Sequence, residues 1–178
     1  MTRYVALLRG VNVGAGTELA MPELSRIVTG LGGTDVRTYL RSGNVVFASE
    51  EDPDRLAGRI RRSLADELAL DVPVLVRSGA ELAALLDGNP YLGVQSDEVK
   101  LLVGFLAEPP DPARVAALTV PEGETAEFTF AGRELYLHYP DGFGRSRFSN
   151  ALLERRLAVA MTIRNWRTVR ALAELTAG

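Results

Sequence analysis

The spacing of apolar residues in the N-terminal part of the chain alternates between strand-like and helix-like. An apolar run predicts a buried strand at residues 3–8, and helical spacing predicts helices over 22–31 and 53–68. Between the helices, residues 36–49 have the β-branched and aromatic runs and the central turn of a β-hairpin. A further apolar run predicts a strand at 72–77, which completes the order β-α-β-β-α-β. This is the order of a ferredoxin-like split βαβ unit.

The same order begins again after a short helical connector. A capping-box sequence predicts that the connector helix spans 78–88. After it, the pattern predicts a strand at 99–106, a helix opened by Asp111, a hairpin at 126–139 and a helix that begins at Ser149. The second half therefore reads β-α-β-β-α, without a clear last strand. No residues match at a fixed period, so the repeat is one of architecture only.

The chain closes with a predicted amphipathic helix over 162–175. Its apolar face consists of Trp166, Val169, Leu172 and Ala173. We therefore predict an α+β fold of two ferredoxin-like halves with antiparallel sheets, plus this C-terminal helix. The predicted boundaries are 1–77 for the N-terminal half, 78–98 for the helical connector and 99–178 for the C-terminal half with its closing helix.

Composition excludes several kinds of site. The 178 residues include no cysteine and one histidine, so disulfides and thiolate sites are excluded and the common zinc patterns lack ligands. We predict neither a metal nor a cofactor. No stretch approaches the roughly 18 apolar residues of a membrane span, and the apolar run at the N-terminus is too short for a signal peptide. The sequence thus predicts a cytoplasmic protein with no membrane partner.

Charge is unevenly distributed along the chain. The net charge is −3, but residues 81–127 carry −7 and residues 128–178 carry +4. All of the basic residues except Lys100 are arginine, the side chain best shaped to grip phosphate or carboxylate with two bonds. This asymmetry can steer a negative ligand toward the C-terminal part. A GC-rich coding sequence explains the arginine content equally well without any function.

Two turns of the N-terminal half contain residues suited to anion binding. The glycine-rich segment 7–16 follows a strand and precedes a helix, as in a phosphate cradle of backbone N–H groups, but it matches no nucleotide-binding fingerprint. Arg9 and Asn12 are its candidate ligand-binding side chains. In the hairpin turn, Arg41 and Ser42 would border the same site if the two turns lie close together. A purely structural turn is the alternative at both places.

A third candidate is the segment 142–149, which precedes a predicted helix. Ser149 as the N-cap accounts for part of it. The cap does not account for the two glycines or for Arg145 and Arg147, which stand at the positive end of the helix dipole. We therefore predict that Arg145 and Ser146 contact an anion.

The closing helix supplies the last candidates. Arg164 and Asn165 are predicted to contribute to the ligand site, the arginine by clamping charge and the asparagine by orienting the ligand. Arg167 and Arg170 extend the basic face of this helix, which could instead contact nucleic-acid phosphates. A solvated basic face is the third interpretation.

The single histidine does not indicate catalysis. His138 lies within nine residues of Asp141 and Ser146, but a catalytic triad is defined by geometry and not by proximity in sequence. The alternating pattern around it predicts a half-exposed strand residue, on the opposite face from Leu135 and Leu137.

Three groups of motifs together resemble one known family. They are YVALLRGVNVG, MPELSRIVTGLGGTDVRTYLRSGNVVF, and GRSRFSNALLERRL followed by TIRNWRTV. In this combination, which spans nearly the whole chain, the sequence is similar to domain-of-unknown-function family 1697, a group of small bacterial proteins. The resemblance implies an α+β fold with ferredoxin-like parts and no established activity. Ile163 stands where the family commonly has a threonine, while Thr162 remains available as a cap.

These patterns favour a domain that binds a small phosphate- or carboxylate-bearing ligand without metal, and they leave open whether it is an enzyme. One alternative is a nucleic-acid-binding module that uses the basic C-terminal part, although the pI of about 5.3 weighs against it. Another is a non-enzymatic interaction protein, which could form a homodimer by pairing at an exposed sheet edge.

Overall fold

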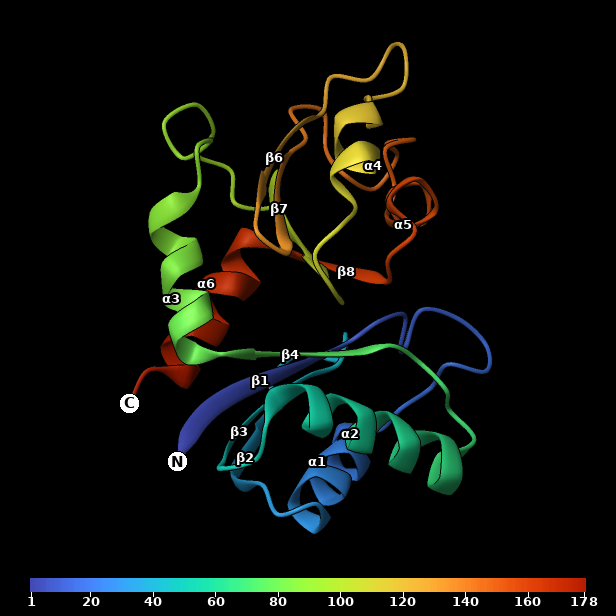
Figure 1. Cartoon of the computed structure of the whole chain (residues 1–178), viewed down its shortest axis with the longest axis vertical. Helices are drawn as coiled ribbons and strands as arrows, with labels where there is room; N and C mark the ends of the chain where they lie inside the picture. The colour runs from blue at the N-terminus through green and yellow to red at the C-terminus, as the bar shows by residue number, and fades with distance from the viewer. The chain divides into compact units, whose positions relative to one another are not determined.

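The computed structural model describes residues 1–178 and has a mixed α+β fold (Figure 1). It contains six helices and two four-stranded antiparallel sheets, which confirms the predicted α+β class with antiparallel sheets. Residues 1–86 together with 171–178 form one compact unit, called unit 1, and residues 87–170 form a second, called unit 2. Each unit is built around one of the sheets.

The sheet of unit 1 has the strand order β2-β3-β1-β4. Its strands are β1 (Thr2–Leu8), β2 (Thr34–Thr38), β3 (Asn44–Ser49) and β4 (Val74–Ser78). The central strand β1 pairs antiparallel with both β3 and β4, so that Tyr4 lies opposite Phe47 on one side and Ser78 on the other. Residues 4–8 of β1 are all buried. Burial on both faces explains why β1 reads as a continuous apolar run without alternation.

Two helices, α1 (Met21–Gly30) and α2 (Pro53–Leu68), cover one face of this sheet (Figure 1). Both have a proline in the first turn, where its missing N–H costs no hydrogen bond. Asp52 caps α2 by accepting the backbone N–H groups of Asp54 and Arg55. The core of unit 1 consists mainly of apolar side chains from these helices and the sheet, among them Leu24, Ile27, Phe47, Leu56, Ile60 and Leu64.

The connector helix is α3 (Gly79–Gly88), and its start matches the predicted capping box. The Ser78 hydroxyl accepts the N–H of Glu81 at 3.2 Å, while the Glu81 carboxylate accepts the N–H of Ser78 at 2.8 Å. These reciprocal bonds satisfy two groups that the first helical turn would otherwise leave unpaired.

The sheet of unit 2 has the order β6-β7-β5-β8. Its strands are β5 (Leu101–Leu106), β6 (Glu127–Ala131), β7 (Glu134–His138) and β8 (Met161–Asn165). Central strand β5 is buried along its whole length and pairs with β7 and β8. In β7, Leu135 and Leu137 join the core of unit 2, as their alternation predicts.

Helices α4 (Pro112–Ala117) and α5 (Asn150–Leu157) contact each other, and α5 also contacts β8 (Figure 1). Asp111 and Ser149 cap the two helices with their side-chain oxygens, as predicted. Phe148, Leu153 and Leu157 are buried in the core of unit 2. The predicted cap at Ser149 therefore fixes the entry of the chain into α5.

Strand β8 differs from the sequence prediction, which placed the start of the closing helix at residue 162. Helix α6 (Trp166–Thr176) begins only after the strand. Met161 packs against Gly104 of β5, where an added Cβ would come within 2.7 Å of its sulfur. Thr162 and Ile163 are β-branched, so pairing with β5 prevails over the helical apolar spacing. With β8, unit 2 also has the order β-α-β-β-α-β.

The predicted apolar face of α6 is confirmed, since Trp166, Val169, Leu172 and Ala173 are all buried. None of the six helices has the length and apolar character that crossing a membrane requires.

Candidate anion-binding loops

Asn12 joins the two turns of the N-terminal half that the sequence marked as candidates. Its Nδ2 donates to the carbonyl oxygens of Arg41, at 2.7 Å, and Leu19, at 3.0 Å. Its Oδ1 accepts the N–H of Leu19 at 2.9 Å. One carboxamide therefore ties segment 9–19 to segment 40–43, and these two segments are called the loop pair.

The hairpin turn is fixed against β1 by Gly43. The Gly43 carbonyl accepts the N–H of Leu8 at 2.8 Å, and the glycine lies directly against Leu8 and Val11. Buried Asn44 donates from Nδ2 to the carbonyl of Tyr39 at 2.7 Å and to the Ser42 hydroxyl at 3.0 Å. The turn is therefore held in place by specific contacts on both of its sides.

Left-handed backbone is concentrated in the loop pair. Gly10, Asn12, Gly16, Leu40 and Gly43 all have positive φ, between 56° and 89°. Glycine adopts this region freely and asparagine tolerates it, but for leucine it is strained. Leu40 is also 54% exposed, so burial does not compensate for the strain. Strained backbone of this kind clusters at ligand sites.

A cavity of about 480 Å³ opens beside the loop pair. It is lined by Asn12, Glu18, Leu19, Ala20, Met21 and Arg41. Arg41 is exposed at its rim and forms no ion pair with the chain. Arg9 is half-buried at the end of β1, and its N–H donates to the carbonyl of Pro73. Of the predicted residues, the structure thus brings Asn12, Arg41 and Ser42 together.

The glycine-rich loop already holds one carboxylate of this chain. Glu18 accepts the backbone N–H of Gly16 at 2.9 Å, in a short turn that Thr17 also stabilises through the carbonyl of Gly14. The N–H groups of Gly14 and Ala15, next to this bond, have no partner within the chain. The loop therefore presents free donors beside an acidic side chain.

In unit 2, segment 142–149 likewise bonds to a carboxylate of the chain itself, that of Glu124. Its carboxylate accepts the Ser146 hydroxyl at 2.8 Å and the backbone N–H of Arg147 at 3.0 Å. The guanidinium of Arg147 lies at 3.4 Å from the carboxylate and also donates to the carbonyl of Glu122. The Arg147 N–H, followed by the Ser146 hydroxyl, lowers the pKa of Glu124 below its ordinary value. This arrangement is called the Glu124 clasp.

Glu124→Gln is expected to lower the melting temperature near neutral pH and to have a much smaller effect in acid. The folded-state pKa of Glu124 is lowered, so the ionised carboxylate stabilises the fold above the unfolded-state pKa of about 4.3. That contribution disappears as the pH falls through the lowered folded-state pKa. Thermal melts of both proteins at about pH 7 and about pH 3 measure the change.

Glu122→Gln is the matched control for the Glu124 clasp. Glu122 is exposed and its contact with Arg147 uses only the backbone carbonyl, so this variant should melt like the wild type. An equal effect of both substitutions at both pH values would contradict the role given to Glu124.

The other predicted residues of the C-terminal part occupy different environments. Arg145 is exposed. Arg164 is buried in β8 and donates to the Thr162 hydroxyl at 2.6 Å and to the carbonyl of Ile163 at 3.0 Å. Burial lowers the pKa of Arg164 to about 10. Asn165 accepts the N–H of Thr168 at 2.9 Å and so stabilises the start of α6.

His138 is buried, with 5% of its surface exposed, and not half-exposed as predicted. The loop before β5 covers it, because Tyr91 packs at 5.5 Å from the imidazole and the amide of Gln95 lies at 3.2 Å from Nε2. The Gln95 Oε1 accepts a backbone N–H, so its NH₂ group faces Nε2. Nε2 is therefore the acceptor, and Nδ1–H donates to Glu127 at 3.1 Å.

Two acidic residues that bond to the candidate segments carried no prediction of such a role. Glu18 and Glu124, which occupy the two glycine-rich segments, were not predicted as part of any site. Glu18 lies two residues after Gly16, a spacing from which a local side-chain bond to the turn can be predicted. Glu124 is far from Ser146 in sequence, and no local signal indicates their contact. No group of three or more His, Cys, Asp or Glu side chains is placed to hold a metal ion.

Comparison with known proteins gives a family and a fold but no activity. No curated protein matches the chain. A solved structure of a conserved bacterial protein from Streptococcus pneumoniae is similar, with 24% sequence identity, a TM-score of 0.78 and 99% of each chain covered. This likeness supports the fold alone. The model of the family described as "Protein of unknown function (DUF1697)" matches residues 1–136, and the chain therefore belongs to the DUF1697 family.

Proposed function

We propose that the loop pair binds a small anionic ligand, phosphate- or carboxylate-bearing, without a metal ion. The observation that carries the proposal is the 2.7 Å hydrogen bond from the Asn12 amide to the Arg41 carbonyl. It joins the glycine-rich loop to the turn that carries Arg41, and both residues line the same cavity. A preformed concavity with a few converging polar groups is the usual form of a small-molecule site.

Two kinds of donor would hold the anion. The Arg41 guanidinium offers paired N–H groups that match a carboxylate or phosphate. The N–H groups of Gly14 and Ala15 have no partner in the chain, and they belong to the same glycine-rich loop as Asn12, although they do not line the cavity. Successive free N–H groups of this kind can form an anion-binding nest. Ser42 and Arg9 belong to the loop pair and complete the proposed site. Ser146 and Asn165 are left out of it, because each bonds to a group of unit 2.

A thermal-shift screen against phosphate, phosphosugars, nucleotides and organic acids tests the proposal, with Arg41→Ala as the site variant. A ligand at about 100 times its Kd stabilises the fold by about 2.7 kcal/mol, which corresponds to a shift of roughly 5 to 10 °C for a chain of this size. Arg41→Ala is expected to abolish that shift. Arg37→Ala, an exposed arginine of β2 outside the cavity, should retain it.

Glu18→Gln provides a second readout in the same screen. Glu18 lines the cavity, so its charge should repel a bound anion. At roughly 6 Å in water, removal of that repulsion tightens binding about threefold. A ligand whose shift survives in Arg41→Ala and does not respond to Glu18→Gln would refute the location of the site.

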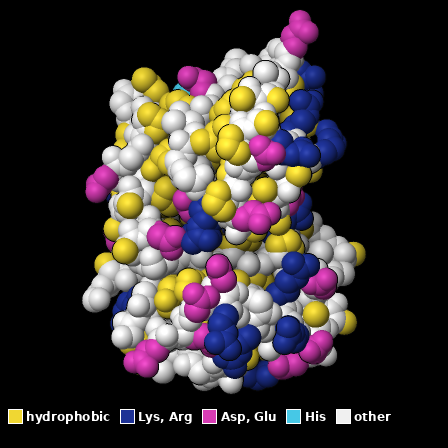
Figure 2. Space-filling model, viewed as in Figure 1, with side chains coloured by type: hydrophobic (Ala, Val, Ile, Leu, Met, Phe, Trp, Pro, Cys, Tyr) yellow, Lys and Arg dark blue, Asp and Glu magenta, His cyan; other side chains and the backbone are white.

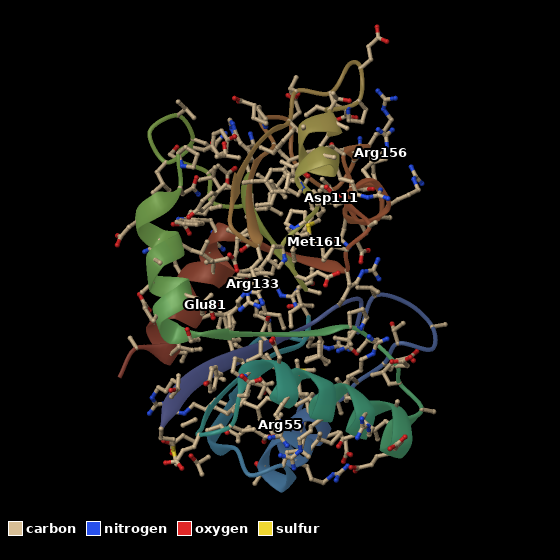
Figure 3. The ribbon with its side chains drawn as sticks, viewed as in Figure 1. Arg55, Glu81, Asp111, Arg133, Arg156 and Met161 are labelled. Atoms are coloured by element: carbon tan, nitrogen blue, oxygen red, sulfur yellow. The ribbon has the colours of Figure 1, made fainter.

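The second candidate is nucleic-acid binding by the basic C-terminal part, and one surface of unit 2 favours it. Arg114 of α4 donates to the backbone carbonyl of Arg156 of α5, which places both beside Arg155. All three are exposed and none forms an ion pair. Figure 2 shows Lys and Arg side chains on the α4–α5 side of unit 2, where Arg156 is labelled in Figure 3. A shift with single-stranded oligonucleotide that is lost in Arg155→Ala and kept in Arg41→Ala would favour this candidate over the loop pair.

A further inference from the structure

The solvent-facing side of α2 carries a groove with a strongly basic lining. It has a volume of about 410 Å³ and is lined by Arg55, Gly58, Arg59 and Arg62. The three arginines are spaced by four and three residues, so they form one row along the helix. All four residues are exposed. Figure 2 shows Lys and Arg side chains over this part of unit 1, with Asp and Glu side chains beside them.

The charge of the groove is only partly neutralised by the chain. Glu51 pairs with Arg59, and its other oxygen lies at 4.0 Å from Arg55. Arg62 forms neither an ion pair nor a hydrogen bond with the chain. Three guanidinium groups line the groove, and the Glu51 carboxylate contacts two of them. The Arg62 guanidinium is therefore the one best placed to bind an added anion.

Gly58 is a residue of the groove whose presence neither helix stability nor packing explains. Glycine in a helix interior is more destabilising than any residue except proline. Here no steric reason requires it, because an added Cβ would meet nothing within 4 Å and the residue does not have positive φ. A glycine between the arginine side chains leaves the helix backbone open, so that a ligand can approach it closely.

We propose that this groove binds the phosphate groups of a small phosphorylated molecule, with Gly58 as its floor and Arg55, Arg59 and Arg62 as its walls. Arg55 and Arg62 are separated by about 10 Å along the helix axis, which accommodates two neighbouring phosphate groups between them. Arginine grips each phosphate with paired N–H groups. The site shares no residue with the loop pair, so it stands independently of the proposed function.

Isothermal titration of the full chain with inorganic pyrophosphate at low ionic strength tests the proposal. Arg62→Ala is expected to weaken binding at least tenfold. Gly58→Ala distinguishes an effect on binding from an effect on stability. The added methyl group should raise the melting temperature by roughly 2 to 4 °C. It should at the same time weaken pyrophosphate binding about threefold or more. Arg37→Ala, which lies outside both the groove and the loop-pair cavity, should bind like the wild type, and titrations in an Arg41→Ala background remove the contribution of the loop pair to pyrophosphate binding.

Three results would overturn the proposal. The first is no detectable pyrophosphate binding to the wild type. The second is a Gly58→Ala variant that is more stable but binds with unchanged affinity. The third is equal affinity for sulfate and pyrophosphate, which would mean general attraction of anions. Inorganic phosphate, titrated in parallel, distinguishes a site for one phosphate group from a site for two.

Discussion

Gly43→Ala is expected to lower the free energy of unfolding by about 3 kcal/mol, from steric overlap together with backbone strain. Gly43 has a φ of 89°, a conformation that alanine adopts only with strain. The new Cβ would lie 2.7 Å from a methyl carbon of Val11 and 2.9 Å from the Cβ of Leu8. Both neighbours are buried, so neither can move away without disturbing the core.

Urea unfolding followed by circular dichroism measures this loss, and Gly14→Ala is the matched control. Gly14 lies in the same loop pair, has no positive φ and has nothing within 4 Å of an added Cβ. We expect that control to remain within about 0.5 kcal/mol of the wild type. Equal unfolding midpoints for Gly43→Ala and the wild type would show that the turn can shift away from β1, and would contradict the packing described for it.

Asn12→Ala is expected to cost about 2 kcal/mol and to eliminate anion binding at the loop pair. The substitution removes three hydrogen bonds and leaves the N–H of Leu19, a buried residue, without its acceptor. It also places alanine at a φ of 56°, which asparagine tolerates better. Without the Nδ2 bond to its carbonyl, Arg41 is no longer tied to the glycine-rich loop.

Asn12→Gly separates the loss of the side-chain hydrogen bonds from the backbone strain. Glycine accepts the positive φ but makes no side-chain bond. We expect Asn12→Gly to be more stable than Asn12→Ala and equally unable to bind the ligand found in the thermal-shift screen. Denaturant unfolding and the ligand-induced shift are measured on both variants. Full ligand binding by Asn12→Gly would show that the amide does not organise the site.

Local sequence signals predicted most of the elements. Asp52 with Pro53 marked the start of α2, the capping box of Ser78 and Glu81 marked α3, and Ser149 marked α5, because caps depend on residues only a few positions apart. Strand β8 was missed because no signal for it lies within a few residues. Its conformation depends on pairing with β5, which is about 60 residues away in the sequence and outside any local pattern.

In the candidate site, too, local sequence signals were recognised and contacts between distant residues were missed. Glycines and arginines in the two segments led to the prediction of anion contacts there, and anion binding stays a prediction. They did not indicate that Glu18 and Glu124 already bond to these segments. A glycine-rich turn before a helix attracts any nearby anion. An acidic side chain of the same chain loses little entropy when it binds there, because the fold has already placed it close to the turn.

The sequence by itself determined the fold class, the order of nearly all elements and the positions of the glycine-rich turns, because those depend on apolar periodicity, caps and turn residues within short segments. Only the tertiary structure decided which segments meet. It joined Asn12 to Arg41, closed Glu124 onto Ser146, buried His138 under Gln95 and turned residues 161–165 into a strand. Each of these contacts joins residues far apart in the chain, and such pairs gain their energy only once the core brings them together.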